Sequence, residues 1–255
     1  TLRLDIEQTL FGLEEPSRPD PGEGSVSTLA PGNVSVQPEE PEEGETPAAS
    51  GPNVMDIDFD ALIANETDST LKDMHEYFRD RTPTEKNQYT GMFQGKNLLL
   101  FTGEAFWIGA VNEQYTPTLY KLAHSGFVFE NFYNPLWYYS TVDGEYAATT
   151  GLIPTNQVNA SQRYAGKNGV SMYFSMGNQL RALGYPTLAY HNNTANYYDR
   201  TLSHPNLGYD FYACDTGLDV AMTWPQSDLE MMQLTLPQAL AGEKPFHNYY
   251  MTVSG

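Results

Sequence analysis

The sequence has little cysteine, few basic residues and no long apolar run, and each absence excludes a class of protein. Cys214 is the only cysteine among 255 residues, so an internal disulfide or a thiolate metal cluster is excluded. A lone cysteine of this kind is expected to be a small buried hydrophobe. Thirteen basic residues stand against 32 acidic ones, which argues against nucleic acid as a partner. Because no apolar run approaches the length of a membrane span, the residues given predict a soluble chain.

The first 52 residues differ in composition from the rest of the chain. They contain eleven of the acidic residues, two basic residues and eight of the seventeen prolines. The acidic run at residues 37–45 cannot bury enough apolar surface to fold. We interpret residues 1–52 as a flexible, acidic, Pro-rich linker, and residues 53–95 as a helical lead-in in which Thr67 or Asp68 caps the second helix.

Residues 96–255 alternate between apolar runs and helical patterns. The run at residues 97–102, bounded by glycines, predicts a strand buried on both faces of a parallel sheet. Strands alternating with helices predict an α/β sheet with helices on both faces, in which ligands gather beyond the carboxyl ends of the strands. The further strands are expected at residues 127–129, 187–190, 211–212 and 246–253, and the helices at residues 116–123, 172–183 and 227–240, the last interrupted at Pro237.

Polar residues follow two of the predicted strands. Glu104 comes directly after the first strand, where its carboxylate would suit a hard cation such as Mg²⁺ or Mn²⁺; the alternative is a local cap or salt bridge. His191 closes the strand at residues 187–190, and Arg200 follows nine residues later. Histidine can move a proton and arginine can grip a phosphate, although each alone would more often be structural.

A pair of hydroxyl residues, Ser140 and Thr141, precedes a short helix predicted at residues 146–150. In the simpler interpretation, one of them caps this helix and Asp143 or Glu145 completes a capping box. In the alternative, Thr141 is a nucleophile held beside a metal and a phosphate at the positive end of the helix dipole. Two other histidines, His204 and His247, have no such placement and are interpreted as structural.

An ordered set of segments in the second part of the chain resembles one family. These segments lie at residues 96–106, 115–119, 129–133, 140–145, 151–154, 183–185, 189–192, 208–210, 244–246 and 251–254. Together they resemble the extracellular catalytic domain of the lipoteichoic acid synthase family, a branch of the alkaline-phosphatase and sulfatase superfamily. The resemblance implies that residues 96–255 are the first part of a sulfatase-like catalytic domain.

The resemblance implies a role for each candidate residue. Glu104 would bind one divalent metal, Mn²⁺ or Mg²⁺, and Thr141 would be both a metal ligand and the nucleophile. His191, Tyr198 and Arg200 would line the pocket for glycerol phosphate, with Tyr198 standing where the family usually has tryptophan. The Cys/Ser-x-Pro-x-Arg signature of the sulfatases is absent around Thr141, so a formylglycine nucleophile is not expected.

The activity implied is glycerophosphotransfer. The donor would be an anionic phospholipid, phosphatidylglycerol, and the acceptor a polyglycerolphosphate chain, at the outer face of the cell membrane of a Gram-positive-type bacterium. The family's Asp-His metal pair and a further pocket histidine would lie beyond Gly255, and a membrane segment would precede Thr1, so we expect this fragment alone to be inactive. A phosphoethanolamine transferase, a phosphodiesterase or a sulfatase-like hydrolase would use the same site. An inactive domain that binds a cell-wall polymer is the alternative from another class.

Overall fold

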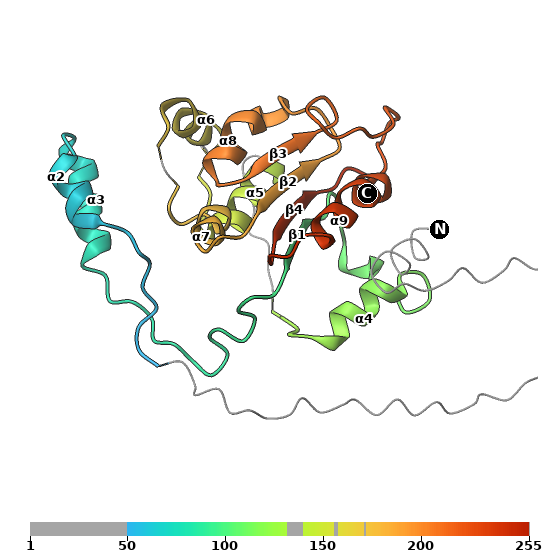
Figure 1. Cartoon of the computed structure of the whole chain (residues 1–255), viewed down its shortest axis with the longest axis horizontal. Helices are drawn as coiled ribbons and strands as arrows, with labels where there is room; N and C mark the ends of the chain where they lie inside the picture. Colours follow the sequence, from blue (N-terminus) through green and yellow to red (C-terminus); the bar gives the residue numbers. More distant parts are fainter. Residues whose placement is uncertain (1–49, 132–139, 156–157, 171, 255) are drawn as a thin grey trace, which may run out of the picture. The chain divides into compact units, whose positions relative to one another are not determined.

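The described residues divide between Gln94 and Gly95 into two compact units (Figure 1). The structure, a computed structural model, describes residues 50–131, 140–155, 158–170 and 172–254. The acidic segment predicted as a linker, residues 1–52, therefore lies almost wholly outside the described residues.

The described part of the first unit contains two capped helices, α2 (Phe59–Asn65) and α3 (Ser69–Arg79). The Asp58 side chain accepts a hydrogen bond from the backbone N–H of Ala61, in the first turn of α2. Asp68 caps α3 by accepting from two backbone N–H groups. Of the two caps predicted for the second helix, Asp68 is therefore the one used.

A four-stranded parallel sheet forms the centre of the second unit. The strands are β1 (Leu98–Thr102), β2 (Thr187–His191), β3 (Asp210–Ala213) and β4 (His247–Met251), and their order across the sheet is β1-β4-β2-β3 (Figure 1). All three pairings are parallel, as the alternation of strands and helices predicted. Every residue of β4 is buried, because this strand has a neighbour on each side and packing on both faces.

Helices connect the strands and cover the sheet. The helix predicted at residues 116–123 begins at Pro117, where the missing N–H group would have no partner within the helix. In chain order the helices are η1 (Ile108–Ala110), α4 (Pro117–Ser125), α5 (Ser140–Thr150), α6 (Val158–Asn168), α7 (Met176–Ala182), η2 (Tyr197–Asp199), α8 (Arg200–Asn206) and α9 (Asp228–Leu240).

The two faces of the sheet carry separate buried clusters, because side chains alternate between faces along a strand. Ala189, Tyr249 and Met251 face one side, where α5, α7 and α8 contact β1, β2 and β3 respectively. Tyr190 and Tyr250 face the other side and pack with α9. The predicted architecture, an α/β sheet with helices on both faces, is therefore confirmed.

Several local predictions were wrong. Residues 127–129 form no strand; their apolar side chains are exposed, with Phe129 at 75%. Strand β1 is not buried on both faces, since it lies at an edge of the described sheet and Phe101 is 50% exposed. Helix α9 continues through Pro237 without interruption, and α7 begins later than predicted, after Ser175. Cys214 is only half-buried, packed against the cluster of Tyr190 and Tyr250.

Within the described ranges, no helix has both the length and the apolar character needed to cross a bilayer.

Candidate active site

The four strands end in one row at the carboxyl edge of the sheet. Thr102 of β1 pairs with Met251 of β4, which pairs with His191 of β2. The chain leaving β1 is tied to the chain leaving β4, because the backbone N–H of Glu104 donates to the Thr252 hydroxyl at 2.8 Å. His191 and the backbone of Glu104 therefore leave the sheet at the same edge, and the Glu104 side chain is exposed there.

Helix α5 begins earlier than predicted and includes both hydroxyl residues. Thr141 is half-buried within the first turn, so it does not occupy the N-cap position of the simpler interpretation. Glu145 lies four residues further on, one turn along the same side of the helix. Its carboxylate is occupied by tertiary contacts, so it is not the partner in a capping box.

The carboxylate of Glu145 is buried among three partners. Arg200 Nη2 lies 2.6 Å from Oε1, and Arg200 Nε lies 3.1 and 3.2 Å from the two oxygens. Tyr249 donates from its hydroxyl to Oε2 at 3.2 Å, and His204 Nε2 lies 3.4 Å from the same oxygen. Burial alone would raise the pKa of the Glu145 carboxyl group, but Arg200 and then His204 hold it well below its usual range. Glu145 is therefore ionised and fixes the second turn of α5 against the sheet.

Arg200 is buried beneath two tyrosines and is 1% exposed. Its Nη1 donates to the backbone carbonyl of Tyr197, and the rings of Tyr197 and Tyr198 lie 5.8 and 5.5 Å from its guanidinium carbon. Its Nε and Nη2 groups donate to Glu145, so most of its hydrogen-bond donors and its positive charge already have partners inside the protein.

His191 is 4% exposed and presents one free ring nitrogen. Its Nδ1 lies 3.1 Å from the backbone carbonyl of Met251, and a carbonyl oxygen can only accept, so Nδ1 carries the proton. Burial and then the charge of Arg200 lower the pKa of His191 to about 4, so the ring is neutral at pH 7. Nε2 has no partner among the described residues and is thus a lone-pair acceptor.

Backbone strain gathers at this edge. Ala105, Tyr198 and Asp199 have φ angles of 50°, 58° and 55°, and they are the only non-glycine residues in the described ranges with positive φ. Burial and contact with Tyr197 raise the pKa of Tyr198, and the charge of Glu104 adds a smaller upward shift. Strained residues persist where the surrounding structure holds them, and they are common at functional sites.

A comparison with protein families identifies this part of the chain. The sulfatase family matches residues 96–255, which is more than half of the sequence. The chain belongs to the sulfatase family. The sulfatase match begins with the segment that leads into β1 and includes the whole carboxyl edge described above.

The solved structures contain a fold similar to this sulfatase domain. The chain is similar to the lipoteichoic acid synthase LtaP from Listeria monocytogenes, with 24% sequence identity and a TM-score of 0.56. The match covers 66% of this chain and 43% of that one, so the chain spans less than half the length of the protein it matches. The comparison with curated proteins gave no match. At this level of identity, the likeness shows the fold.

The described residues of the sulfatase domain do not form a metal site by themselves. Within them, no three His, Cys, Asp or Glu side chains converge in a way that could hold a metal ion. Glu104 and Thr141 offer oxygen atoms of the kind that Mg²⁺ and Mn²⁺ prefer, but two such residues fall short of a coordination shell.

Two residues at the centre of the site, Glu145 and Tyr249, were missed by sequence reasoning. The spacing of Glu145 from Thr141 was a helical signal, but its partner Arg200 lies 55 residues away and no local pattern connects them. Tyr249 was indistinguishable from its neighbours in an aromatic strand. His204, interpreted as structural, is buried and faces Glu145. His247 is structural as predicted, bonded to the Tyr209 hydroxyl and to a backbone carbonyl of β1.

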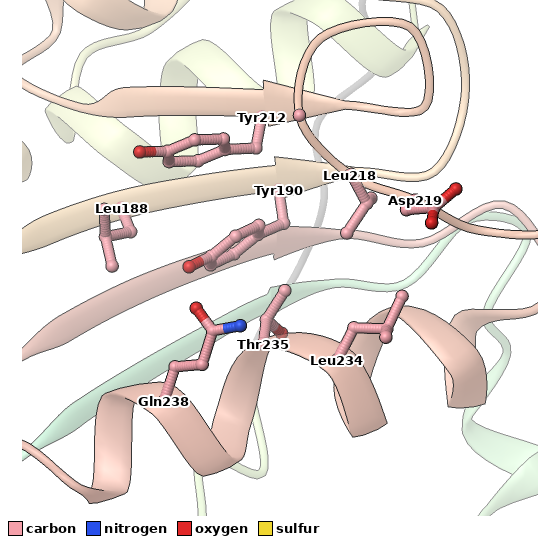
Figure 2. A pocket seen from close by; sticks show the side chains of 9 residues that line it. Leu188, Tyr190, Tyr212, Leu218, Asp219, Leu234, Thr235 and Gln238 are labelled. Atoms are coloured by element: carbon pink, nitrogen blue, oxygen red, sulfur yellow. The ribbon is translucent and has the colours of Figure 1, made fainter.

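A pocket of about 270 Å³ lies on the opposite face of the sheet (Figure 2). Figure 2 shows Tyr190 and Tyr212 side by side on adjacent strands, facing α9. None of the predicted site residues lines it. The remaining lining residues are Leu188, Gly217, Leu218, Asp219, Leu234, Thr235 and Gln238.

Proposed function

We propose that this sulfatase-family protein is a metal-dependent phosphotransferase that moves glycerol phosphate from phosphatidylglycerol to a polyglycerolphosphate acceptor through Thr141. The observation that carries this proposal is the setting of Thr141. It lies in the first turn of α5, one turn before the buried carboxylate that fixes this helix to the sheet. The similarity of the fold to a lipoteichoic acid synthase agrees with this choice of substrate.

The proposed reaction has two transfers through one threonine oxygen. In the first, the oxygen of Thr141 forms a bond to phosphorus as the bond to diacylglycerol breaks, and the threonine proton ends on the diacylglycerol oxygen. In the second, a hydroxyl of the acceptor attacks phosphorus, the bond to Thr141 breaks, and the acceptor's proton returns to the threonine. A covalent intermediate of this kind divides one difficult displacement into two easier ones.

His191 contributes a neutral acceptor to this scheme. Its free Nε2 lone pair suits a hydroxyl group, either of the glycerol or of the attacking acceptor, better than it suits a phosphate oxygen. Arg200 is paired with Glu145 and bonded to the carbonyl of Tyr197, so it would contact the phosphate only through N–H groups that these partners do not occupy. Tyr198 would pack its ring against the polyol.

We further propose one Mn²⁺ or Mg²⁺, with the carboxylate of Glu104 and the hydroxyl of Thr141 among its oxygen ligands. When bound, a divalent cation lowers the pKa of a coordinated hydroxyl and balances charge on phosphoryl oxygens. Because no three His, Cys, Asp or Glu side chains among the described residues cluster as a metal site, we propose that other groups complete the coordination shell. Because the proposed donor is a phospholipid, we propose that the reaction takes place at a cell membrane, on its outer face.

Replacement of Thr141 tests the nucleophile. Full-length protein is incubated with phosphatidylglycerol vesicles and release of diacylglycerol is measured. Thr141→Ala is expected to lower turnover by at least about a thousandfold, because nothing replaces the attacking oxygen. Thr141→Ser, the matched control, keeps a hydroxyl and should retain part of the activity. Chelation of divalent cations should abolish the activity of the wild-type protein. Undiminished turnover by a folded Thr141→Ala variant contradicts the proposal.

A second candidate follows from the incomplete metal site among the described residues. A domain without a full coordination shell could bind a cell-wall polymer without turning it over. The same preparation distinguishes the two. Polyglycerolphosphate binding without diacylglycerol release from any phospholipid favours the binding domain, whereas release from phosphatidylethanolamine alone identifies a phosphoethanolamine transferase.

A further inference from the structure

Glu145 joins the helix of Thr141 to the strand that leads to Glu104. One oxygen of its carboxylate accepts from Tyr249, whose hydroxyl lies 3.1 Å from the Thr102 hydroxyl. Thr102 is the last residue of β1, two residues before Glu104. A hydroxyl carries one proton, so Tyr249 donates to the carboxylate, the stronger acceptor, and Thr102 supplies the proton of the other bond.

The backbone beyond Thr102 continues this network. The carbonyl of Thr102 accepts from the N–H of Thr252, and the Thr252 hydroxyl accepts from the N–H of Glu104. A chain of contacts thus runs from the second turn of α5, through the hydroxyl groups of Tyr249, Thr102 and Thr252 and the end of β1, to the backbone of Glu104. The chain therefore links the helix that carries Thr141 to Glu104, and these two residues are the proposed metal ligands.

A buried ion pair whose only role was stability would not require this chain. Arg200 alone satisfies both carboxylate oxygens of Glu145 through its Nε and Nη2 groups. The hydroxyl of Tyr249 is additional, and it extends the contact across β4 to β1, the strand next to it in the sheet.

We propose that Glu145 is a positioning residue, which acts through Tyr249 and Thr102 to hold the hydroxyl of Thr141 in register with Glu104. The proposal rests on the proposed function for the roles of those two residues. Loss of the chain removes none of the residues that contact substrate, but it lets α5, and Thr141 with it, shift relative to β1. Displacements of about 1 Å at a reacting group are enough to lower turnover by as much as a hundredfold.

The test compares two adjacent tyrosines. Tyr249→Phe removes the hydroxyl that links Glu145 to Thr102. Tyr250→Phe, the matched control, removes an equally buried hydroxyl on the opposite face, where it contacts Thr235 and Asn248. In full-length protein, kcat, KM and thermal midpoint are measured for both, together with amide hydrogen exchange across residues 141–145.

Both variants lose one buried hydroxyl, so similar falls in thermal midpoint are expected. Only Tyr249→Phe should lower kcat, by about tenfold to a hundredfold with KM unchanged, and accelerate exchange in the first turns of α5. Equal kcat values and equal exchange in the two variants overturn the proposal, as does an effect confined to KM. If Tyr249→Phe does not fold, Thr102→Val removes the same link from its other end.

The experiment also separates this proposal from the function on which it rests. If the wild-type protein and Thr141→Ser release no diacylglycerol, the proposed function fails, and hydrogen exchange still decides the positioning role. Faster exchange in Tyr249→Phe than in Tyr250→Phe supports a link that holds α5, and equal exchange rejects it.

Discussion

Replacement of Glu145 by glutamine should destabilise the protein far more than replacement of any exposed ion-pair partner. The substitution keeps the shape of the side chain but removes the charge that compensates Arg200. The glutamine amide has only one oxygen, so its NH₂ group must face either the N–H donors of Arg200 or the side chains of Tyr249 and His204. On either side, an NH₂ donor then stands where an acceptor is needed. Arg200 is 1% exposed, so its guanidinium cannot recover these bonds from water.

The magnitude follows from what remains buried. Breaking a buried ion pair by removing one partner destabilises a protein by about 3–5 kcal/mol, because the other charge is left uncompensated. Domains of this size have unfolding free energies of about 5–15 kcal/mol, so Glu145→Gln removes about a fifth or more of the total. Replacing both charges, as in Glu145→Leu with Arg200→Met, should be less damaging than the single change, since no charge is then stranded.

Urea denaturation at pH 7 measures the effect. The control is Arg181→Gln, which breaks an exposed contact of 3.0 Å with Asp210 and a hydrogen bond of 2.9 Å to the Thr187 hydroxyl, and it should change the unfolding free energy by no more than about 2 kcal/mol. The pKa of Glu145 is lowered on folding, so its contribution is present above about pH 4.3, the ordinary glutamate value, and is lost as the pH falls further. The reasoning is refuted if Glu145→Gln is as stable as Arg181→Gln, or if the double variant is no more stable than the single one.

Two further predictions concern stability. Folding lowers the pKa of His191 to about 4, so as the pH falls the imidazole is protonated in the unfolded chain before it is protonated in the folded one. The unfolding free energy should therefore fall by up to about 3 kcal/mol between pH 7 and pH 4. The urea midpoint of His191→Asn should fall less than that of the wild type over this range, and equal falls would contradict the lowered pKa. Gly144→Ala adds a methyl group in open space within α5 and should raise the unfolding free energy by about 0.5–1 kcal/mol. Gly208→Ala should lower it by about 2–4 kcal/mol, because Gly208 has a φ of 91° and the methyl group would lie 2.4 Å from the backbone nitrogen of Asn178. Thermal midpoints that shift in the same direction for the two alanines would contradict the second prediction.

The carboxyl edge of the sheet was predictable from sequence because it depends on local patterns. A continuous apolar run followed by Glu104, and another strand closed by His191, are visible without any tertiary information. Parallel pairing then requires both strands to end on the same side, and the structure has them in one register row through Met251.

The network that holds the edge together was not predictable in the same way. Glu145 meets Arg200 from 55 residues away and Tyr249 from 104 residues away, and each side chain has an ordinary alternative role within its own element. Helix α8, which carries Arg200, contains Pro205, a residue that favours a turn over a helix. The two residues before the helix also have left-handed backbone, which non-glycine residues seldom adopt. Long-range charge pairing overrides these local preferences.

The failure at residues 127–129 has a different cause, and it shows what an apolar run can and cannot predict. The same pattern of consecutive apolar residues occurs at residues 98–101, which form β1, and at residues 127–129, which do not form a strand. Periodicity records only that a segment is suited to burial; a strand also needs a partner whose N–H and C=O groups are free. Strand β1 pairs with β4, whereas residues 127–129 belong to no strand in the described sheet, and the side chains of Phe127 and Phe129 are exposed. The strand at residues 98–102 therefore depends on β4, 145 residues later in the chain, and so does the position of Glu104 that β1 fixes.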